Sequence, residues 1–277
     1  HRASMKYYQK SLEKEGFNVK YIEFDKKLIN RGYVMFDPVD KLKLKPTEML
    51  ETPNFLLTKE DYKSYRKTTD KFFFNNFYAF GKKINDIIPN IKSQDKQNRK
   101  RMPKNISIPD IPKQSKDEKP FIEEAIQYIE KNFSKNYGNT DNFNYPITHT
   151  EARKWLKDFI ENRFKKFGPY EDFVMQQEPH LFHSVLSSSI NIGLLNPLEI
   201  IDKIRSLEKK IPINSYEGYI RQLYWREYQR FCYLYFDFTS TDYFKNKNKL
   251  TKSWYDGTLG INPVDDCIKK GFDSGYL

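Results

Sequence analysis

Hydrophobic residues recur with helical spacing over most of the chain, and near the N-terminus they alternate as they do in a strand. Residues 2–15 predict an amphipathic helix, which Gly16 would end as its C-terminal cap. The apolar stripe of that helix consists of Ala3, Met5, Tyr8 and Leu12. Residues 17–24 alternate and predict a strand. A helix followed by a strand is half of an α/β unit, so we expect a parallel sheet in this region.

Aromatic residues and charged loops dominate the middle of the chain. Phe55–Leu57 reads as the end of a strand, and Thr58 then stands where a helix N-cap is expected. The aromatic block at 72–80 predicts a buried helix. Residues 93–119 are charged, contain prolines and have few apolar positions, which indicates a long linker or surface loop.

From residue 120 onward the periodicity is almost entirely helical. Helix starts are expected at Pro120, at Thr148 with Glu151 in a capping box, at Asn196 and at Asn214. The stripe after Thr148 consists of Ala152, Trp155, Leu156, Phe159, Ile160 and Phe164, and Gly168 would end that helix. Several capped helices without strands between them predict an all-α domain.

The fold class is therefore mixed, with a partial N-terminal α/β domain followed by an all-α domain. We place a truncated α/β domain at 1–50 and an interdomain region with aromatic helices and a basic linker at 51–135. The helical domain then occupies 136–277. Because the chain lacks an initiating Met and ends without a closing element, we expect it to be a fragment.

Composition narrows the classes of partner. The formal net charge of +11 favours polyanions, with nucleic acid first and an anionic membrane surface second. No apolar run approaches the roughly 20 residues that a membrane helix needs, so we expect no membrane partner. The two cysteines, Cys232 and Cys267, give no disulfide framework. An intracellular protein of the cytoplasm or nucleus, not a secreted one, fits this pattern.

One basic run lies inside the expected linker. Residues 95–104 hold five basic side chains and one acidic side chain. Such a run is either a solvated loop or a strip that contacts phosphates. The sequence leaves both readings open.

A hydroxyl-rich block occupies residues 181–195. It crowds the hydroxyls of Ser184, Ser187, Ser188 and Ser189 and their backbone N–H groups into one turn, which can cradle a diphosphate. The alternative is an ordinary serine-capped turn. His183 alone reads as a hydrogen-bonded structural histidine.

The helical block at 214–236 gathers chemistry on one face. Gln222, Trp225, Arg226 and Gln229 share that face, and Arg230 lies one turn beyond Arg226. A face with tryptophan, glutamine and two cations suits an aromatic, anionic ligand. The alternative is that Trp225 belongs to the core and that Arg226 and Glu227 form ordinary salt bridges.

A third block, Trp254 to Cys267, is a glycine-rich turn followed by a helix that begins near Pro263. The order of the three blocks resembles the photolyase–cryptochrome family. The family's FAD diphosphate loop is matched by His183-Ser184-Val185-Leu186-Ser187. The helix that follows this loop in the family is matched by Trp225-Arg226-Glu227, and the family's third motif is matched by Trp254 to Asp265. The closest branch is that of the prokaryotic (6-4) photolyases and iron–sulfur bacterial cryptochromes.

The resemblance implies a Rossmann-like antenna domain followed by a helical domain that binds FAD. Reduced, photoexcited FAD would split a pyrimidine dimer flipped out of UV-damaged DNA. The cofactor contacts implied are Tyr170, His183, Ser184, Leu186, Ser187, Asn191, Gln222 and Arg226. The DNA-facing residues implied are Gln222, Trp225, Arg226 and Arg230. Trp254 stands where the family has an electron-relay tryptophan, and an antenna chromophore of the lumazine or folate type is a further expectation.

This chain departs from the branch at two points. A [4Fe–4S] cluster needs about four cysteine ligands, and the chain has two, so we expect neither a cluster nor another metal. The family's helix that contacts the isoalloxazine lies beyond Leu277, so the remainder of a split protein is a possible partner; otherwise we expect a monomer. A cryptochrome-like photoreceptor and a catalytically inactive DNA-binding remnant are the alternatives.

Overall fold

Helices are the main secondary structure in the computed structural model, which describes residues 1–23, 32–40, 44–176, 178–237 and 248–276. The helices before the centre of the chain are α1 (Arg2–Lys14), α2 (Lys59–Arg66), α3 (Phe74–Ile84), the 3₁₀ turn η1 (Asp95–Gln97) and α4 (Lys119–Phe133). Those after it are α5 (His149–Asp158), α6 (Phe164–Tyr170), α7 (Ser187–Asn191), α8 (Pro197–Arg205), α9 (Ile213–Tyr235), α10 (Lys252–Asp256) and α11 (Asn262–Ser274). A π-helical turn, η2 (Phe159–Arg163), joins α5 to α6.

The predicted N-terminal helix is confirmed, but the strand after it is wrong. Gly16 has a φ of +91°, and the N–H of Phe17 returns to the carbonyl of Leu12, as in a helix C-cap. Residues 17–23 then form no strand, and the side chain of Phe17 is 60% exposed. Phe24 lies outside the described residues. Alternation alone did not make a strand here, since no strand among the described residues pairs with this segment.

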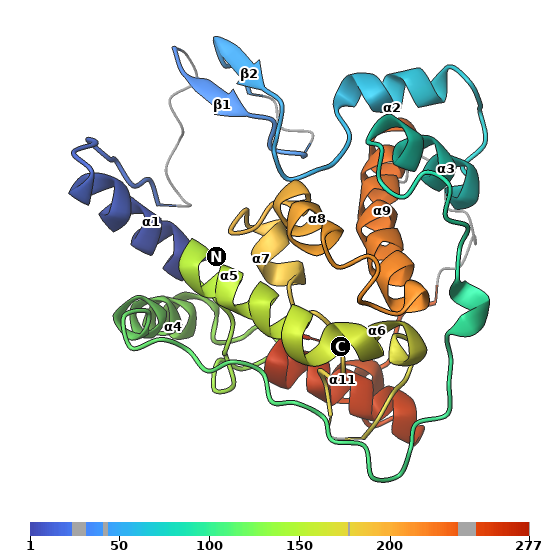
Figure 1. Ribbon diagram of the computed structural model, residues 1–277. Coiled ribbons are helices and arrows are strands. Elements are labelled where there is room, and N and C mark those ends of the chain that lie inside the picture. Colours follow the sequence, from blue (N-terminus) through green and yellow to red (C-terminus); the bar gives the residue numbers. More distant parts are fainter. Residues whose placement is uncertain (24–31, 41–43, 177, 238–247, 277) are drawn as a thin grey trace.

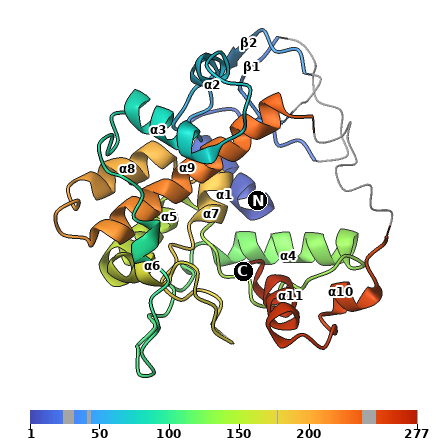
Figure 2. The same cartoon turned by 90° about the vertical axis from the view of Figure 1, so that its right-hand side faces the viewer.

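A parallel sheet does occur, at positions the sequence did not indicate. It pairs β1 (Val34–Phe36) with β2 (Glu48–Leu50) in the register Val34 to Glu48. The side chains of this pair are mostly exposed, so the hydrophobic alternation that marks a half-buried strand is weak. In Figures 1 and 2 the pair lies with α2 at the end of the molecule opposite α4 and α11.

The expected strand end at Phe55–Leu57 is also wrong, for a reason that lies far away in the sequence. The carboxylate of Glu227 in α9 accepts hydrogen bonds from the backbone N–H groups of Leu56 and Leu57 at 2.9 and 3.1 Å. These are the donors that a sheet would use, so the segment forms turns. The N-cap at Thr58 is confirmed, with a reciprocal capping box to Asp61.

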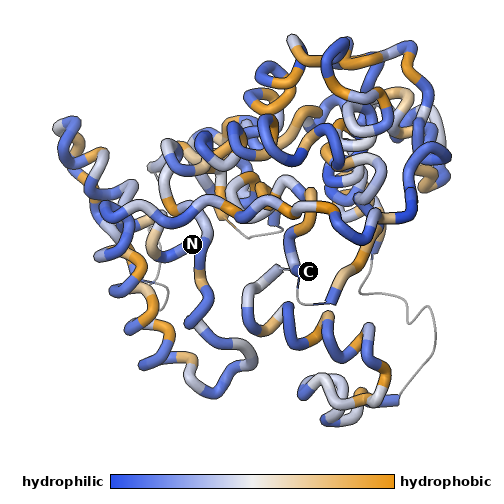
Figure 3. The backbone as a smooth tube through the Cα atoms, turned by 60° about the horizontal axis from the view of Figure 1, so that its bottom comes forward, coloured by the Kyte–Doolittle hydropathy of each residue, from blue (hydrophilic) through white to orange (hydrophobic). Residues whose placement is uncertain are grey.

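Helix α9 is the central element of the main hydrophobic core. Its inner face packs against α3, η2, α6 and α8 through aromatic and aliphatic side chains that include Phe159, Phe164, Tyr219, Ile220 and Tyr224. A second aromatic cluster formed by α2, α3 and the later turns of α9 extends this core. Figure 3 shows the pattern behind this packing, with hydrophobic positions recurring along the helices between hydrophilic stretches.

Two expected helix boundaries are wrong where α6 meets α9. Gly168 does not end its helix, since α6 continues to Tyr170. Its lack of a side chain serves packing instead, because a Cβ there would lie 2.6 Å from backbone atoms of Asn214 and Ser215. Helix α9 begins at Ile213, and Asn214 is a buried residue that donates to Asn98, not a cap.

The remaining helix starts agree with the sequence. Thr148 and Asn196 each accept a hydrogen bond from the N–H three residues on, and α11 begins with Pro263 in its first turn. Helix α4 begins at Lys119 with Pro120 in its first turn. Residues 98–118 run as irregular chain, as expected for a surface loop. Within the described ranges, no helix is both long and apolar enough to cross a membrane.

Candidate functional site

Two cavities lie against the short helix α7, which carries the hydroxyl-rich block. Ser187 and Ser188, at its start, line a cavity of about 500 Å³ that we call the serine cavity. Asn191, at its end, lines a cavity of about 1120 Å³ that we call the strand-end cavity. His1 lines both. Of the expected cofactor residues, Ser187 therefore lines one cavity, and Asn191 and Arg226 line the other.

The serine cavity combines apolar walls with a polar end. Ile122, Ile126 and Ile129 of α4 form one wall, and the C-terminal segment 271–276 forms another. The hydroxyl oxygen of Ser188 is buried and has no hydrogen-bond partner among the described residues. A buried hydroxyl without a partner costs free energy, so this atom is an unsatisfied polar group beside the cavity.

The loop before α7 is strained and firmly held. Leu181 and Val185 have positive φ values of +42° and +54°, and Val185 is β-branched, for which this conformation is a rare outlier. Arg163 donates to the carbonyl of Leu181 at 2.9 Å, and the His183 ring nitrogen Nε2 lies 3.1 Å from the carbonyl oxygen of Glu171. Strained loops held by their surroundings are common at binding sites.

The histidines of this loop are uncharged at neutral pH. Burial lowers the pKa of His183 below its ordinary value, and burial together with the nearby Arg163 lowers the pKa of His180 to about 4. His183 therefore acts as a structural hydrogen-bonding residue. Arg163 is itself almost fully buried and also donates to the carbonyls of Pro109 and Asp110.

Several expected cofactor residues support this loop without lining either cavity. The Tyr170 ring packs on that of Phe182 with centroids 5.5 Å apart, and Leu186 is fully buried. Ser184 and His183 are half-buried. The neutral histidine and the buried leucine hold the backbone from which Ser187 and Ser188 project.

The exposed face of α9 has the composition expected from the sequence. Gln222, Trp225 and Gln229 are exposed, while Leu223, Glu227 and Phe231 are buried. The indole of Trp225 stacks on Phe74 of α3, with centroids 3.6 Å apart and planes 5° apart, and stays 36% exposed. Gln222 donates to Glu171 at 3.4 Å. One face of the indole is thus held against the protein.

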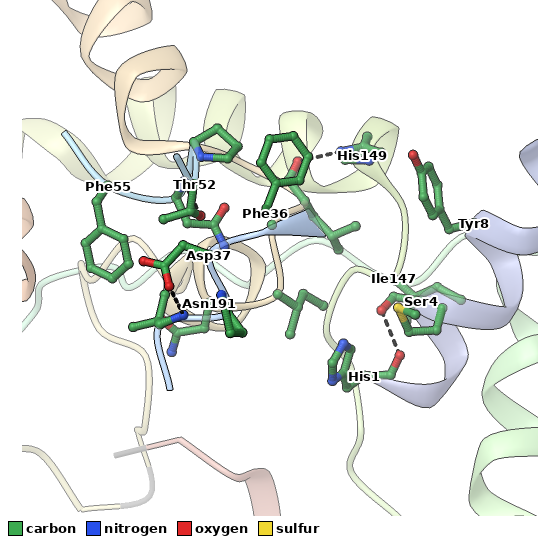
Figure 4. Close-up of a pocket in the computed structure, with 18 of the residues that line it drawn as sticks. His1, Ser4, Tyr8, Phe36, Asp37, Thr52, Phe55, Ile147, His149 and Asn191 are labelled. Carbon is green, nitrogen blue, oxygen red and sulfur yellow. Dashed lines mark hydrogen bonds between the residues drawn. The ribbon is translucent and has the colours of Figure 1, made fainter. Parts of the chain in front are cut away.

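The strand-end cavity brings together residues that the sequence did not connect. One side is formed by Phe36 at the end of β1 and by the segments 37–39 and 52–55, which follow β1 and β2. Figure 4 shows Asp37, Thr52, Phe55 and Asn191 around this space, with Tyr8 and His149 farther along it. Asp37 and Phe55 were missed because the strands before them were not recognised.

Two arginines of α9 clasp one aromatic ring in this cavity. The guanidinium carbons of Arg226 and Arg230 lie 4.1 and 4.3 Å from the centroid of the Phe55 ring. Arg226 also donates to the Asn54 carbonyl and to the Asn191 side chain. It forms no ion pair with any described residue.

Arg230 pairs with the carboxylates that directly follow the two strands. Its Nη2 donates to Asp37, which follows β1, at 2.6 Å, and lies 3.4 Å from Glu51, which follows β2. Its side chain is almost completely buried, so it is withdrawn from the exposed face of α9. Burial opposes ionisation of Asp37, but the hydrogen bond from Lys59 and the charge of Arg230 lower the pKa of Asp37 below its ordinary value.

Trp254 lies apart from both cavities. It is on α10 and 43% exposed, and its neighbour Tyr255 stacks with Tyr137 at 5.2 Å. Cys232 and Cys267 are free thiols. In the described part of the chain, no group of three or more His, Cys, Asp or Glu side chains is arranged to hold a metal ion.

Comparison with known proteins gives concordant matches. A family profile described as deoxyribodipyrimidine photo-lyase-related protein matches residues 35–145, which include most of β1 and all of β2, α2, α3 and α4. A (6-4) photolyase of Agrobacterium fabrum is 32% identical over 161 residues, which are 56% of this chain and 32% of that protein. An uncharacterized protein of Acanthamoeba polyphaga mimivirus is 43% identical over 110 residues, 38% of this chain and 85% of that protein. The chain thus spans about a third of the length of the bacterial photolyase.

Proposed function

Because this chain belongs to the deoxyribodipyrimidine photo-lyase-related protein family, we propose that it contributes to a flavin-dependent, light-driven repair of UV-made pyrimidine dimers in DNA. The observation that carries the proposal is the serine cavity. The strained loop 181–187 leads into α7, and the first two residues of α7, Ser187 and Ser188, line a space with apolar walls.

The serine cavity suits the phosphate-proximal part of FAD. Ser187 and Ser188, with the backbone N–H groups of the first turn of α7, would hold the diphosphate, since Leu186 at the N-cap offers those groups no side-chain acceptor. Ile126 and Ile129 would cover apolar parts of the cofactor. When bound and reduced, FAD supplies the photoexcited electron for dimer splitting.

The exposed face of α9 is our proposed DNA-facing wall. Stacking on Phe74 fixes the indole of Trp225, so its outer face is ready to stack on a base without further ordering. Gln222 beside it offers an amide to a base edge. A dimer leaves the duplex at low cost because a damaged base is poorly stacked. Arg230 braces this helix from behind, and an electron-relay role for Trp254 stays a prediction.

The strand-end cavity is our proposed site for a second, antenna chromophore of the lumazine or folate type. Ligands of α/β proteins bind outside the carboxyl ends of parallel strands, and both strand ends of this chain border the cavity. The Phe55 ring and Arg226 offer an apolar surface and a cation to a flat, anionic ring system. On this proposal the strand pair belongs to a Rossmann-like domain.

The test is flavin binding followed by repair. The purified chain is titrated with FAD. Two signals are followed, the flavin absorbance near 450 nm and the resistance of the bound flavin's emission to an added quencher. The expected result is saturable binding and blue-light-dependent loss of dimers from UV-irradiated DNA. Flavin binding without repair would favour a photoreceptor, and DNA binding without flavin would favour an inactive remnant; each outcome refutes the repair proposal.

A further inference from the structure

A patch of unpaired cations lies beside the exposed face of α9. It consists of Lys96 of η1, Lys100, Arg101 and Lys104 of the irregular segment, and Lys165 and Lys166 of α6. We call these six residues the basic strip. All six side chains are exposed, and none forms an ion pair with another described residue. Neither cavity uses them.

Packing brings the two halves of the strip together. The N–H of Lys100 donates to the Pro169 carbonyl of α6 at 3.0 Å. Met102 is buried in a cluster with Leu181 and Phe182, and the Nζ atom of Lys166 lies 5.0 Å from the centroid of the Phe182 ring. A buried methionine thus pins the irregular segment, so its basic residues lie along α6 as a fixed surface feature.

The acidic residues next to the strip do not cancel its charge. Arg99 forms ion pairs with both Asp95 and Asp172, at nitrogen–oxygen distances of 3.0 and 2.9 Å. Arg221 forms an ion pair with the buried Glu171 at 2.9 Å. The local carboxylates are therefore matched by arginines that are not part of the strip. Its own six cations remain available to an outside anion.

The strip continues the proposed DNA-facing wall. Gln222, on the exposed face of α9, donates to Glu171, which directly precedes the Asp172 that pairs with Arg99. Arg221 reaches Asp95 at 3.4 Å, at the start of the basic run. A duplex seated on Gln222 and Trp225 would therefore place flanking phosphates over the irregular segment and α6.

We propose that the basic strip binds the phosphate backbone of double-stranded DNA, independently of damage and of flavin. The choice of DNA as the polyanion rests on the proposed function. Exposed cations that neutralise phosphates release counterions, which makes binding strongly salt-dependent and insensitive to sequence. The strip would position the duplex, while the α9 face reads the lesion.

The test measures binding of undamaged duplex DNA in the dark at several salt concentrations. The variant replaces Lys100, Arg101 and Lys104 with alanine, and the matched control replaces Lys14, Lys131 and Lys135, exposed lysines in or near α1 and α4, at a distance from α6 in Figures 1 and 2. The strip variant should lose roughly tenfold or more in affinity near 0.1 M salt, and its salt slope should fall by about 0.9 per lost contact. The control should keep the slope of the original chain.

A second strip variant distinguishes loss of DNA binding from loss of folding. Lys165→Ala with Lys166→Ala changes only exposed positions on α6, and should lower the salt slope by about two contacts with unchanged thermal unfolding. Equal affinity losses in the strip and control variants, or unchanged slopes in both strip variants, would overturn the proposal. Repair that fails while the strip still binds DNA would refute the proposed function and leave this inference standing.

Discussion

Replacing Glu227 with glutamine tests how α9 holds the turn at Leu56 and Leu57, about 170 residues earlier in the chain. The carboxylate of Glu227 is fully buried and accepts three hydrogen bonds, from the N–H groups of Leu56 and Leu57 and from the Tyr62 hydroxyl at 2.7 Å. These donors favour the charged form, whereas burial favours the neutral form. Burial is the larger effect and raises the pKa of Glu227 to about 7.

The sign of the pH dependence follows from that shift. An unfolded glutamate titrates near its ordinary value of 4.5, and the folded one near 7, so between these values the folded state binds more protons. The stabilising contribution of Glu227 is therefore fully present below pH 4.5 and is lost as pH rises through 7. At about 1.4 kcal/mol per pKa unit, the loss amounts to roughly 3 kcal/mol.

The assay is urea unfolding of the original chain and of Glu227→Gln between pH 4.5 and pH 8. Glutamine does not titrate, and other ionisable groups cancel in the difference between the two unfolding free energies. That difference, original minus variant, should fall by roughly 3 kcal/mol over the range. Glu227→Ala should show the same fall from a different starting value. A difference that stays flat or grows with pH would refute the reasoning.

Three further substitutions test the site and its framework. Ser188→Ala should leave the free energy of unfolding within about 0.5 kcal/mol, because its hydroxyl has no partner, yet weaken FAD binding about tenfold in a titration. Ser189→Ala is the control, because the hydroxyl of Ser189 is also buried and without a partner but Ser189 does not line the serine cavity; equal effects on FAD binding would contradict the assignment. Arg163→Met should cost about 3–5 kcal/mol in chemical denaturation, because it strips the partners from Asp158 and from three backbone carbonyls; a loss below about 1 kcal/mol would contradict that account. Gly168→Ala should cost about 1–3 kcal/mol and lower the melting temperature, because the added Cβ meets the backbone of α9, whereas a wild-type melting temperature would mean that α6 and α9 separate freely.

Local signals predicted the helices well. Thr58, Thr148 and Asn196 cap helices because their side chains reach N–H groups only three residues away, a relation that the sequence displays directly. The division of α9 into an exposed and a buried face follows from helical spacing in the same way. Within such short distances, residue order determines geometry.

Contacts between remote residues could not be predicted in this way. The sheet formed at 34–36 and 48–50, not at 17–24, because pairing depends on a second strand and not on alternation alone. The turn at Leu56 and Leu57 depends on a carboxylate about 170 residues later. Trp225 could be identified as a surface residue, but its stacking on Phe74 depends on how α3 packs.

The candidate site shows the same division. Ser187 and Ser188 were identified from the hydroxyl-rich block, and they do line a cavity. Arg230 was expected to face DNA, yet its carboxylate partners, Asp37 and Glu51, directly follow two strands that the sequence did not indicate. Whether a cation is free or paired depends on chain segments that only the fold brings near.

The ion pair between Arg230 and Asp37 also has a consequence for folding while the chain is being synthesised. The two residues are 193 positions apart, so at 5–20 residues per second roughly 10–40 s separate their synthesis. The carboxylate of Asp37 has two partners that are made before Arg230. These are the N–H of Val39 at 3.3 Å and the Nζ atom of Lys59 at 3.0 Å in the finished molecule. Lys59, which is close to Asp37 in sequence, can thus pair with this carboxylate during synthesis, before Arg230 has been added to the chain.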